Sequence, residues 1–104
     1  MGLDIVVKHW TYNTVISENI THNVRDMWIK AGIYDALYNS NGKKVEEVLE
    51  TLKKGYADMY DKPEEYRKLD APNGWGTYVD AIYWLKVLIE QMERYPLGKI
   101  AADK

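Results

Sequence analysis

Apolar residues recur at intervals of three and four between residues 45 and 59, and this pattern restricts the fold more than any other feature of the sequence. The apolar positions are Val45, Val48, Leu49, Leu52, Tyr56 and Met59. Most residues between them are Lys, Glu or Asp. This spacing predicts an amphipathic α-helix with one apolar face and one charged face. We interpret the charged face as solvent-exposed and not as a binding site.

A second long helix is predicted from Thr77 to about Tyr95. Thr77 and Asp80 have the spacing of a helix-start signature, in which side chains cap free backbone N–H groups. The apolar positions that follow are Val79, Ile82, Tyr83, Leu85, Leu88, Ile89 and Met92. Trp84 and Val87 widen this face, so we expect the central helix of the fold here.

Shorter helices are predicted on either side of the first long one. One begins near Thr21–Asn23 and ends at Gly32, a residue suited to the left-handed conformation that ends helices. Another short helical turn covers Ile33–Tyr38. A third runs from Asp61 to about Leu69, with Pro63 in its first turn. Two glycines and a proline interrupt the chain between residues 71 and 76.

Strands are predicted at both ends of the chain. The β-branched cluster between Leu3 and Trp10 predicts a central strand, and residues 99–102 predict a short closing strand. Residues 11–20 are expected to form an irregular connection that carries at most a short extended piece. The predicted fold is therefore α+β, a mostly helical single domain (1–104) with three to four helices packed on a small sheet of terminal strands.

Composition excludes several classes of protein. The net charge of −2 argues against nucleic-acid binding, and the absence of cysteine excludes disulfides and thiolate metal sites. No apolar run predicts a transmembrane helix or a signal peptide, so we expect a cytoplasmic protein that does not bind membranes.

Nine Tyr and four Trp replace Phe entirely. They suit a ligand cleft, a contact between subunits or the core. The free edges of a small sheet would also allow a homo-oligomer.

A dense polar segment precedes the first short helix. Its candidate ligand-binding residues are Asn19, Thr21, His22, Asn23 and Arg25. Free N–H groups and the helix dipole favour an anion at such a position, and these side chains can supplement them. The alternative is a helix cap in a hydrogen-bonded loop. Capping needs only one or two of the residues, so the surplus favours a ligand.

The loop before the second long helix supplies further candidates, Asn73, Trp75 and Tyr78. Its glycines allow close approach of a ligand to the backbone, and Trp75 offers a stacking face. The alternative is a tight turn in which Trp75 fills the core. If this loop and residues 19–25 converge, they form one polar pocket with aromatic walls.

Two segments, NITHNVRDMWIKAGIY (19–34) and NGWGTYVDAIYWL (73–85), resemble a family of short uncharacterised bacterial and phage proteins. The shared features are an Asn/Thr-rich segment that leads into a helix and an N-G-W-G-x-Y loop that opens the last long helix. The resemblance covers most of residues 5–102. It implies the fold layout and a shared polar feature, but no reaction. A phage setting also implies an anti-defence role, such as sequestering a host signal nucleotide.

Catalysis has little support in the sequence. His9 and His22 are the only histidines, and neither belongs to a recognisable catalytic or metal-binding motif. We therefore predict no catalytic residue, no metal and no cofactor. The predicted function is that of a small binding protein, not an enzyme, which holds a small polar or nucleotide-like ligand. The alternative is a protein–protein interaction module or inhibitor that binds a host protein through a Tyr/Trp-rich surface.

Overall fold

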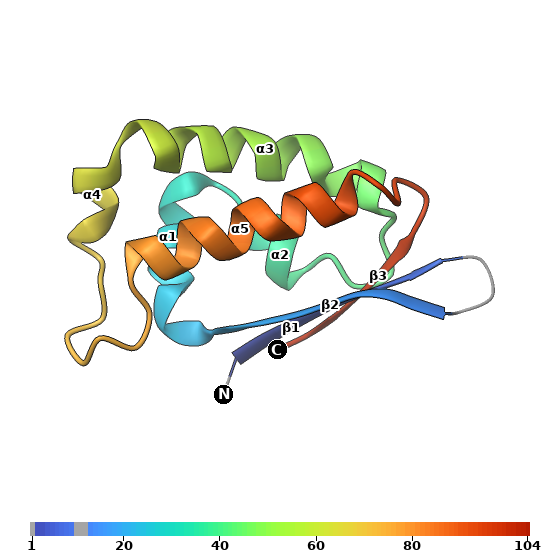
Figure 1. Ribbon diagram of the computed structural model, residues 1–104, viewed down its shortest axis with the longest axis horizontal. Helices are drawn as coiled ribbons and strands as arrows, with labels where there is room; N and C mark the ends of the chain where they lie inside the picture. The colour runs from blue at the N-terminus through green and yellow to red at the C-terminus, as the bar shows by residue number, and fades with distance from the viewer. Residues whose placement is uncertain (1, 10–12) are drawn as a thin grey trace.

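In the part of the chain that the structure describes, three antiparallel strands form one sheet, and five α-helices lie on one of its faces (Figure 1). The computed structural model describes residues 2–9 and 13–104. The elements in chain order are β1 (Gly2–His9), β2 (Asn13–Thr21), the 3-10 helix η1 (His22–Val24), α1 (Arg25–Ala31), α2 (Tyr34–Tyr38), α3 (Val45–Asp61), α4 (Pro63–Arg67), α5 (Tyr78–Met92) and β3 (Lys99–Asp103). The α+β class and the mostly helical content are thus confirmed. None of these helices is long and apolar enough to cross a bilayer.

Strand β1 lies in the middle of the sheet, whose order is β2-β1-β3, as its continuous apolar run predicted. The prediction for residues 11–20 is wrong, because residues 13–21 form the second strand. Ile16 and Ile20 are buried while Ser17 and Asn19 are exposed, which is the alternation of a half-buried strand. Glu18 lies between them at a position that faces the helices. A charged residue at such a position makes the alternation difficult to recognise in the sequence. The predicted strand end, Trp10, lies outside the described residues.

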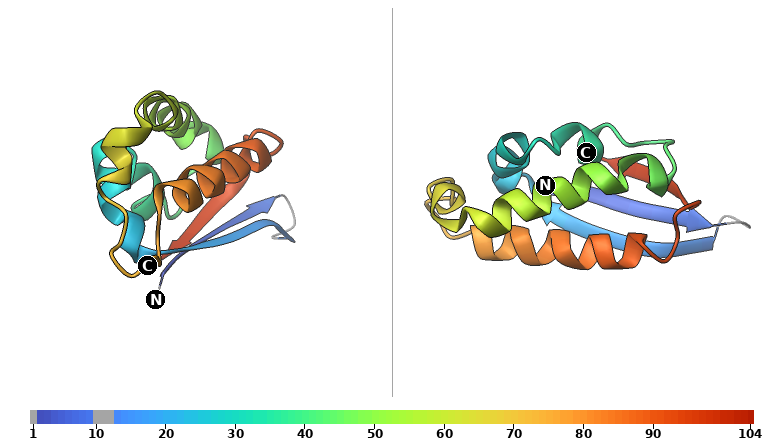
Figure 2. Two further views of the ribbon diagram at one scale, coloured as in Figure 1. Left: turned by 60° about the vertical axis from the view of Figure 1, so that its left-hand side comes forward. Right: turned by 90° about the horizontal axis from the view of Figure 1, so that it is seen from above.

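Helix α5 lies along the β2 side of the sheet and packs against α3 (Figure 2). It ends at Met92 and not at the predicted Tyr95, the residue in which the following Pro96 disfavours helical backbone. Helix α4 likewise ends at Arg67 and not at Leu69. The layer between helices and sheet is filled by the buried side chains Leu3, Ile5, Val7, Trp28, Leu52, Leu85, Leu88 and Ile100.

The sheet face that carries no helix places like charges beside each other. Asp4 pairs with Asp103 across β1 and β3, and Lys8 pairs with Lys99. An isolated bridge places Lys44 opposite Lys99 on the other side. Like charges directly opposite each other destabilise a sheet, so Lys99 lies at an unfavourable position between two cations.

Replacing Lys99 with glutamate is therefore expected to stabilise the protein by about 0.5 kcal/mol, because the new carboxylate attracts both neighbouring lysines. Urea unfolding at low and high salt measures the effect, which salt should reduce. The matched control is Lys54→Glu on α3. This change places a third acidic residue one turn from Glu50 and Asp58 and is expected to destabilise slightly. Equal effects of both substitutions would contradict the role of the Lys8–Lys99–Lys44 row.

A short hydrogen bond attaches α4 to α3. The Tyr66 hydroxyl donates to Asp58 Oδ2 at 2.5 Å, and Lys62 Nζ lies 2.9 Å from Asp58 Oδ1. The Tyr66 hydrogen bond, followed by that of Lys62, lowers the pKa of Asp58. Burial and the same hydrogen bond raise the pKa of Tyr66. The pair therefore stabilises the fold most strongly between the two titrations.

Tyr66→Phe is expected to lower the free energy of unfolding by about 1 kcal/mol at neutral pH. The lowered pKa of Asp58 means that its contribution is complete above the ordinary carboxyl pKa of about 4 and is lost as the pH falls through the lowered value. The raised pKa of Tyr66 means that its contribution is lost as the pH rises above about 10. Urea unfolding across this range should show both losses in the wild type and weaker ones in Tyr66→Phe. Tyr60→Phe, at an exposed tyrosine on α3, is the control. It should change neither the loss of stability at low pH nor the loss at high pH.

Candidate functional site

The segment at η1 and the loop before α5 lie against each other. Asn23 Nδ2 donates to the Trp75 carbonyl oxygen at 2.7 Å. Gly76 makes this approach possible, because a Cβ there would lie 2.9 Å from Asn23 Cβ. The backbone of Gly76 has φ of 116°, a value that favours glycine. The two polar segments therefore converge as proposed from the sequence.

Several predicted ligand-binding side chains in these segments hydrogen bond within the protein. Thr21 caps η1, accepting from the backbone N–H of Asn23 at 3.2 Å. Asn73 Oδ1 accepts from the Trp75 backbone N–H at 2.9 Å, which closes a tight turn. Each of these bonds closes a turn within its own segment, and the Asn23–Trp75 bond joins the two segments, so much of the polar surplus is used inside the protein.

The remaining polar candidates are dispersed. Asn19 lies on the bare sheet face and donates to Asp4 Oδ1 at 2.6 Å. His22 Nδ1 is hydrogen bonded to the Tyr38 hydroxyl at 2.8 Å. Burial raises the pKa of Tyr38. Arg25 is exposed and, within the described part of the chain, forms no ion pair.

The two aromatic candidates have opposite environments. Trp75 is 74% exposed and does not fill the core, which corrects the tight-turn alternative in this respect. Tyr78 is buried, and its hydroxyl donates to the Met59 carbonyl oxygen at 2.6 Å. Tyr78 therefore fixes the start of α5 against α3, and Trp75 is an aromatic side chain of the loop that stays accessible.

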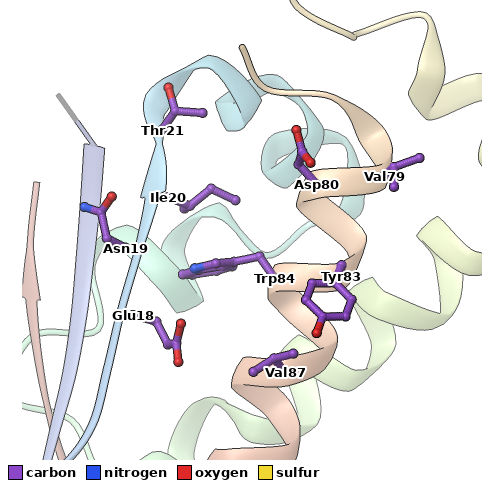
Figure 3. A pocket seen from close by; sticks show the side chains of 9 residues that line it. All are labelled: Glu18, Asn19, Ile20, Thr21, Val79, Asp80, Tyr83, Trp84 and Val87. Atoms are coloured by element: carbon purple, nitrogen blue, oxygen red, sulfur yellow. The ribbon is translucent and has the colours of Figure 1, made fainter. Parts of the chain in front are cut away.

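A hollow of about 630 Å³ opens between β2 and α5 (Figure 3). Its lining consists of Glu18, Asn19, Ile20, Thr21, Val79, Asp80, Tyr83, Trp84 and Val87. Asn19 and Thr21 are the predicted site residues that line it. The others, His22, Asn23, Arg25, Asn73, Trp75 and Tyr78, do not belong to its lining. The volume falls within the range of small-ligand pockets.

The walls of this hollow are mainly apolar. Val79 is 60% exposed and Tyr83 67% exposed, although both are large apolar side chains. Trp84 extends from α5 toward β2 and is 9% exposed (Figure 3). Its indole N–H is buried and has no hydrogen-bond partner in the described part of the chain. The hollow thus presents accessible apolar surface, and the Trp84 N–H behind it is itself buried.

Two carboxylates flank the apolar lining. Glu18 comes from β2 and Asp80 from the first turn of α5 (Figure 3). Glu18 Oε2 accepts from Gln91 Nε2 at 2.9 Å. No Lys or Arg is among the nine lining residues. The hollow is therefore electrostatically unfavourable for an anion and favourable for a cationic group beside an apolar one.

A second hollow, of about 400 Å³, lies on the other side of α5. It is lined by Tyr56, Tyr60, Pro63, Arg67, Tyr78, Val79, Ile82, Tyr83 and Lys86. Arg67 lies over the ring of Tyr78, 5.7 Å from its centroid. Val79 and Tyr83 belong to both hollows and form the ridge between them.

Val79 and Tyr83 were predicted to lie on the apolar face of α5 that packs in the core, but both are exposed. A signal was present, because nine apolar positions between 79 and 92 surround more of a helix than one sheet can cover. Trp84, Leu85, Leu88 and Ile89 are buried, and the excess remains at the surface. In the described part of the chain, no group of three or more His, Asp or Glu residues is arranged to hold a metal ion.

Comparison with known proteins does not identify a relative. No protein-family model matches the sequence, and neither a curated protein nor a solved structure matches it. The resemblance to short bacterial and phage proteins therefore stays a prediction.

Proposed function

We propose that the protein is a non-enzymatic interaction module that holds a segment of a partner protein in the hollow between β2 and α5. The observation that carries this proposal is the exposure of Val79 and Tyr83 beside that hollow. Contiguous exposed apolar surface next to a concavity is typical of protein-binding sites, and tyrosine is enriched among the residues that dominate binding energy.

The charges of the hollow favour this partner over a small anion. Glu18 and Asp80 would repel a phosphate or carboxylate, whereas a basic side chain of a partner would be attracted. The polar side chains at the paired helix starts, Asn23 and Asn73, already hydrogen bond within the protein. A nucleotide-like ligand would have to displace those bonds.

The resemblance to phage proteins suggests the biological role of such a module. A phage protein that covers a functional segment of a host protein acts as an inhibitor. We propose this role and a cytoplasmic location together, because a chain without cysteine suits a reducing compartment.

A selection from a displayed library of random peptides tests the proposal. Peptides that bind the wild-type protein should bind Tyr83→Ala about tenfold more weakly or worse, because the substitution removes the main exposed wall of the hollow. Tyr83 is exposed, so the variant should stay as stable as the wild type. Fluorescence anisotropy with labelled peptides measures both affinities.

Leu97→Ala is the matched control for this selection. Leu97 is also an exposed apolar residue, but it lines neither hollow. Binding that is equally strong in wild type, Tyr83→Ala and Leu97→Ala would overturn the proposal. Binding that is lost in Trp75→Ala and kept in Tyr83→Ala would overturn it too, and would place the site at the converged loops.

A further inference from the structure

Strand β2 forms a free edge of the sheet beside the hollow. Its only strand neighbour in the described part of the chain is β1. In an antiparallel pair, alternate peptide groups of an edge strand face away from the partner strand. Within the same described residues, no backbone or side-chain group outside β1 hydrogen bonds to the peptide groups of residues 14–20. These N–H and C=O groups are therefore available to another strand.

We infer that the partner segment binds in extended form as a fourth strand paired to β2, with alternate side chains in the hollow beneath α5. This inference rests on the proposed function and adds the mode of binding and the chemistry of the partner. Strand addition to a sheet edge is a recurrent mode of peptide recognition, in which main-chain bonds supply affinity and pockets select alternate side chains.

The lining of the hollow defines which side chains the added strand presents. Successive side chains of a strand point to opposite faces, so every second residue of the segment would face the helices. Of the β2 residues on that face, Ile20 is apolar and Glu18 is acidic (Figure 3). Val79 and Tyr83 cover the same space from α5. An apolar side chain fits beside Ile20, and a basic one fits beside Glu18.

The second carboxylate extends this pattern. Asp80 lies at the Val79 end of the hollow, and Glu18 lies toward Val87 (Figure 3). A basic residue at each end and an apolar residue between them therefore complement the lining. The recognised pattern is basic-x-apolar-x-basic, with the three specified residues facing α5.

A second copy of β2 is a poorer occupant of the same edge. Glu18 faces the helices near the middle of β2, so two paired copies would bring two Glu18 side chains to the same hollows, which have no Lys or Arg in their lining. An inward-facing charge on an edge strand is a known means of preventing association between edges. The observations therefore favour a basic partner over self-association.

A seven-residue peptide with blocked ends, in which Lys, Val and Lys alternate with Thr, is the probe. Titrated into ¹⁵N-labelled wild-type protein, it should shift amide signals of residues 14–21 and 79–87 and slow hydrogen exchange of alternate amides in β2. Two N-methylated versions of the peptide, methylated on alternate residues in the two possible frames, separate strand pairing from side-chain binding. One frame should bind about tenfold more weakly or worse, and the other should bind nearly as well as the parent.

Glu18→Gln tests the charge pairing, with Glu90→Gln as its control because Glu90 is exposed on α5 and lines neither hollow. Glu18→Gln should weaken binding severalfold and reduce its salt dependence, while Glu90→Gln should not. The inference is overturned if the peptide causes no shifts up to its solubility limit, if both N-methylated frames bind as well as the parent, or if shifts depend on protein concentration alone. Displayed peptides that still depend on Tyr83 in those cases would leave the proposed function intact.

Discussion

Trp28→Ala is expected to lower the free energy of unfolding by about 3–5 kcal/mol. Trp28 is fully buried in α1, and its ring lies 5.8 Å from that of Trp84, centroid to centroid. Truncation removes a fully buried tryptophan side chain and leaves a cavity behind the wall of the hollow. Loss of an unpartnered indole N–H offsets a small part of the cost. Stabilities of 5–15 kcal/mol are usual for single domains, so this variant should unfold at much lower urea concentration.

Trp75→Ala is the matched control, because it makes the same chemical change at a side chain that is 74% exposed. Its free energy of unfolding should remain within about 0.5 kcal/mol of the wild type. Far-UV circular dichroism is the appropriate probe, since fluorescence would change with the number of tryptophans. Equal losses in the two variants would contradict the difference in burial on which the prediction depends.

Gly76→Ala is expected to cost about 2–5 kcal/mol. One contribution, about 1–3 kcal/mol, is the positive φ of 116° at this residue. The other is a steric conflict, since the new methyl group would lie 2.9 Å from Asn23 Cβ and 3.2 Å from Val24 Cγ1. The substitution should separate the loop from η1 and break the bond from Asn23 to the Trp75 carbonyl. Urea unfolding measures the first effect, and the Asn23 side-chain amide signals in NMR spectra report the second.

Gly74→Ala separates backbone strain from the steric conflict. Gly74 also has a positive φ, 77°, but no atom lies within 4 Å of where its Cβ would be. Its alanine variant should cost only about 1–2 kcal/mol and leave the Asn23 amide signals unchanged. If both glycine variants lost the same stability and kept those signals, the proposed contact between loop and η1 would be wrong.

Local sequence patterns predicted the helices well because their apolar spacing is regular. The pattern between residues 45 and 59 became α3, the Thr77–Asp80 cap begins α5, and Gly32 ends α1 with φ of 76°. Strand β2 escaped prediction for two local reasons. Glu18 breaks the apolar alternation, and a register shift opposite Val7 and Lys8 interrupts the pairing with β1. Both features depend on the neighbours of the strand in the folded protein, α5 for Glu18 and β1 for the register shift.

The site was predictable only in part. The polar residues at two helix starts predicted a site at the segments around Asn23 and Trp75, and these segments are in contact. Which groups remain free was not predictable, because hydrogen bonds such as Asn19 to Asp4 join residues 15 positions apart. The hollow itself depends on which part of the broad apolar face of α5 the sheet leaves uncovered. That depends on the placement of α5 over β2, which no local pattern contains.

The ridge shared by the two hollows has a thermodynamic consequence. Tyr83 can adopt only one rotamer at a time, and it lines the acidic hollow on one side of α5 and the tyrosine-rich hollow on the other. A ligand that fixes this ring toward one side changes the affinity of the other side by a definite coupling free energy. By reciprocity, occupation of either hollow must then affect the other equally. An exposed tyrosine on a helix can thus couple two neighbouring hollows without any movement of the backbone.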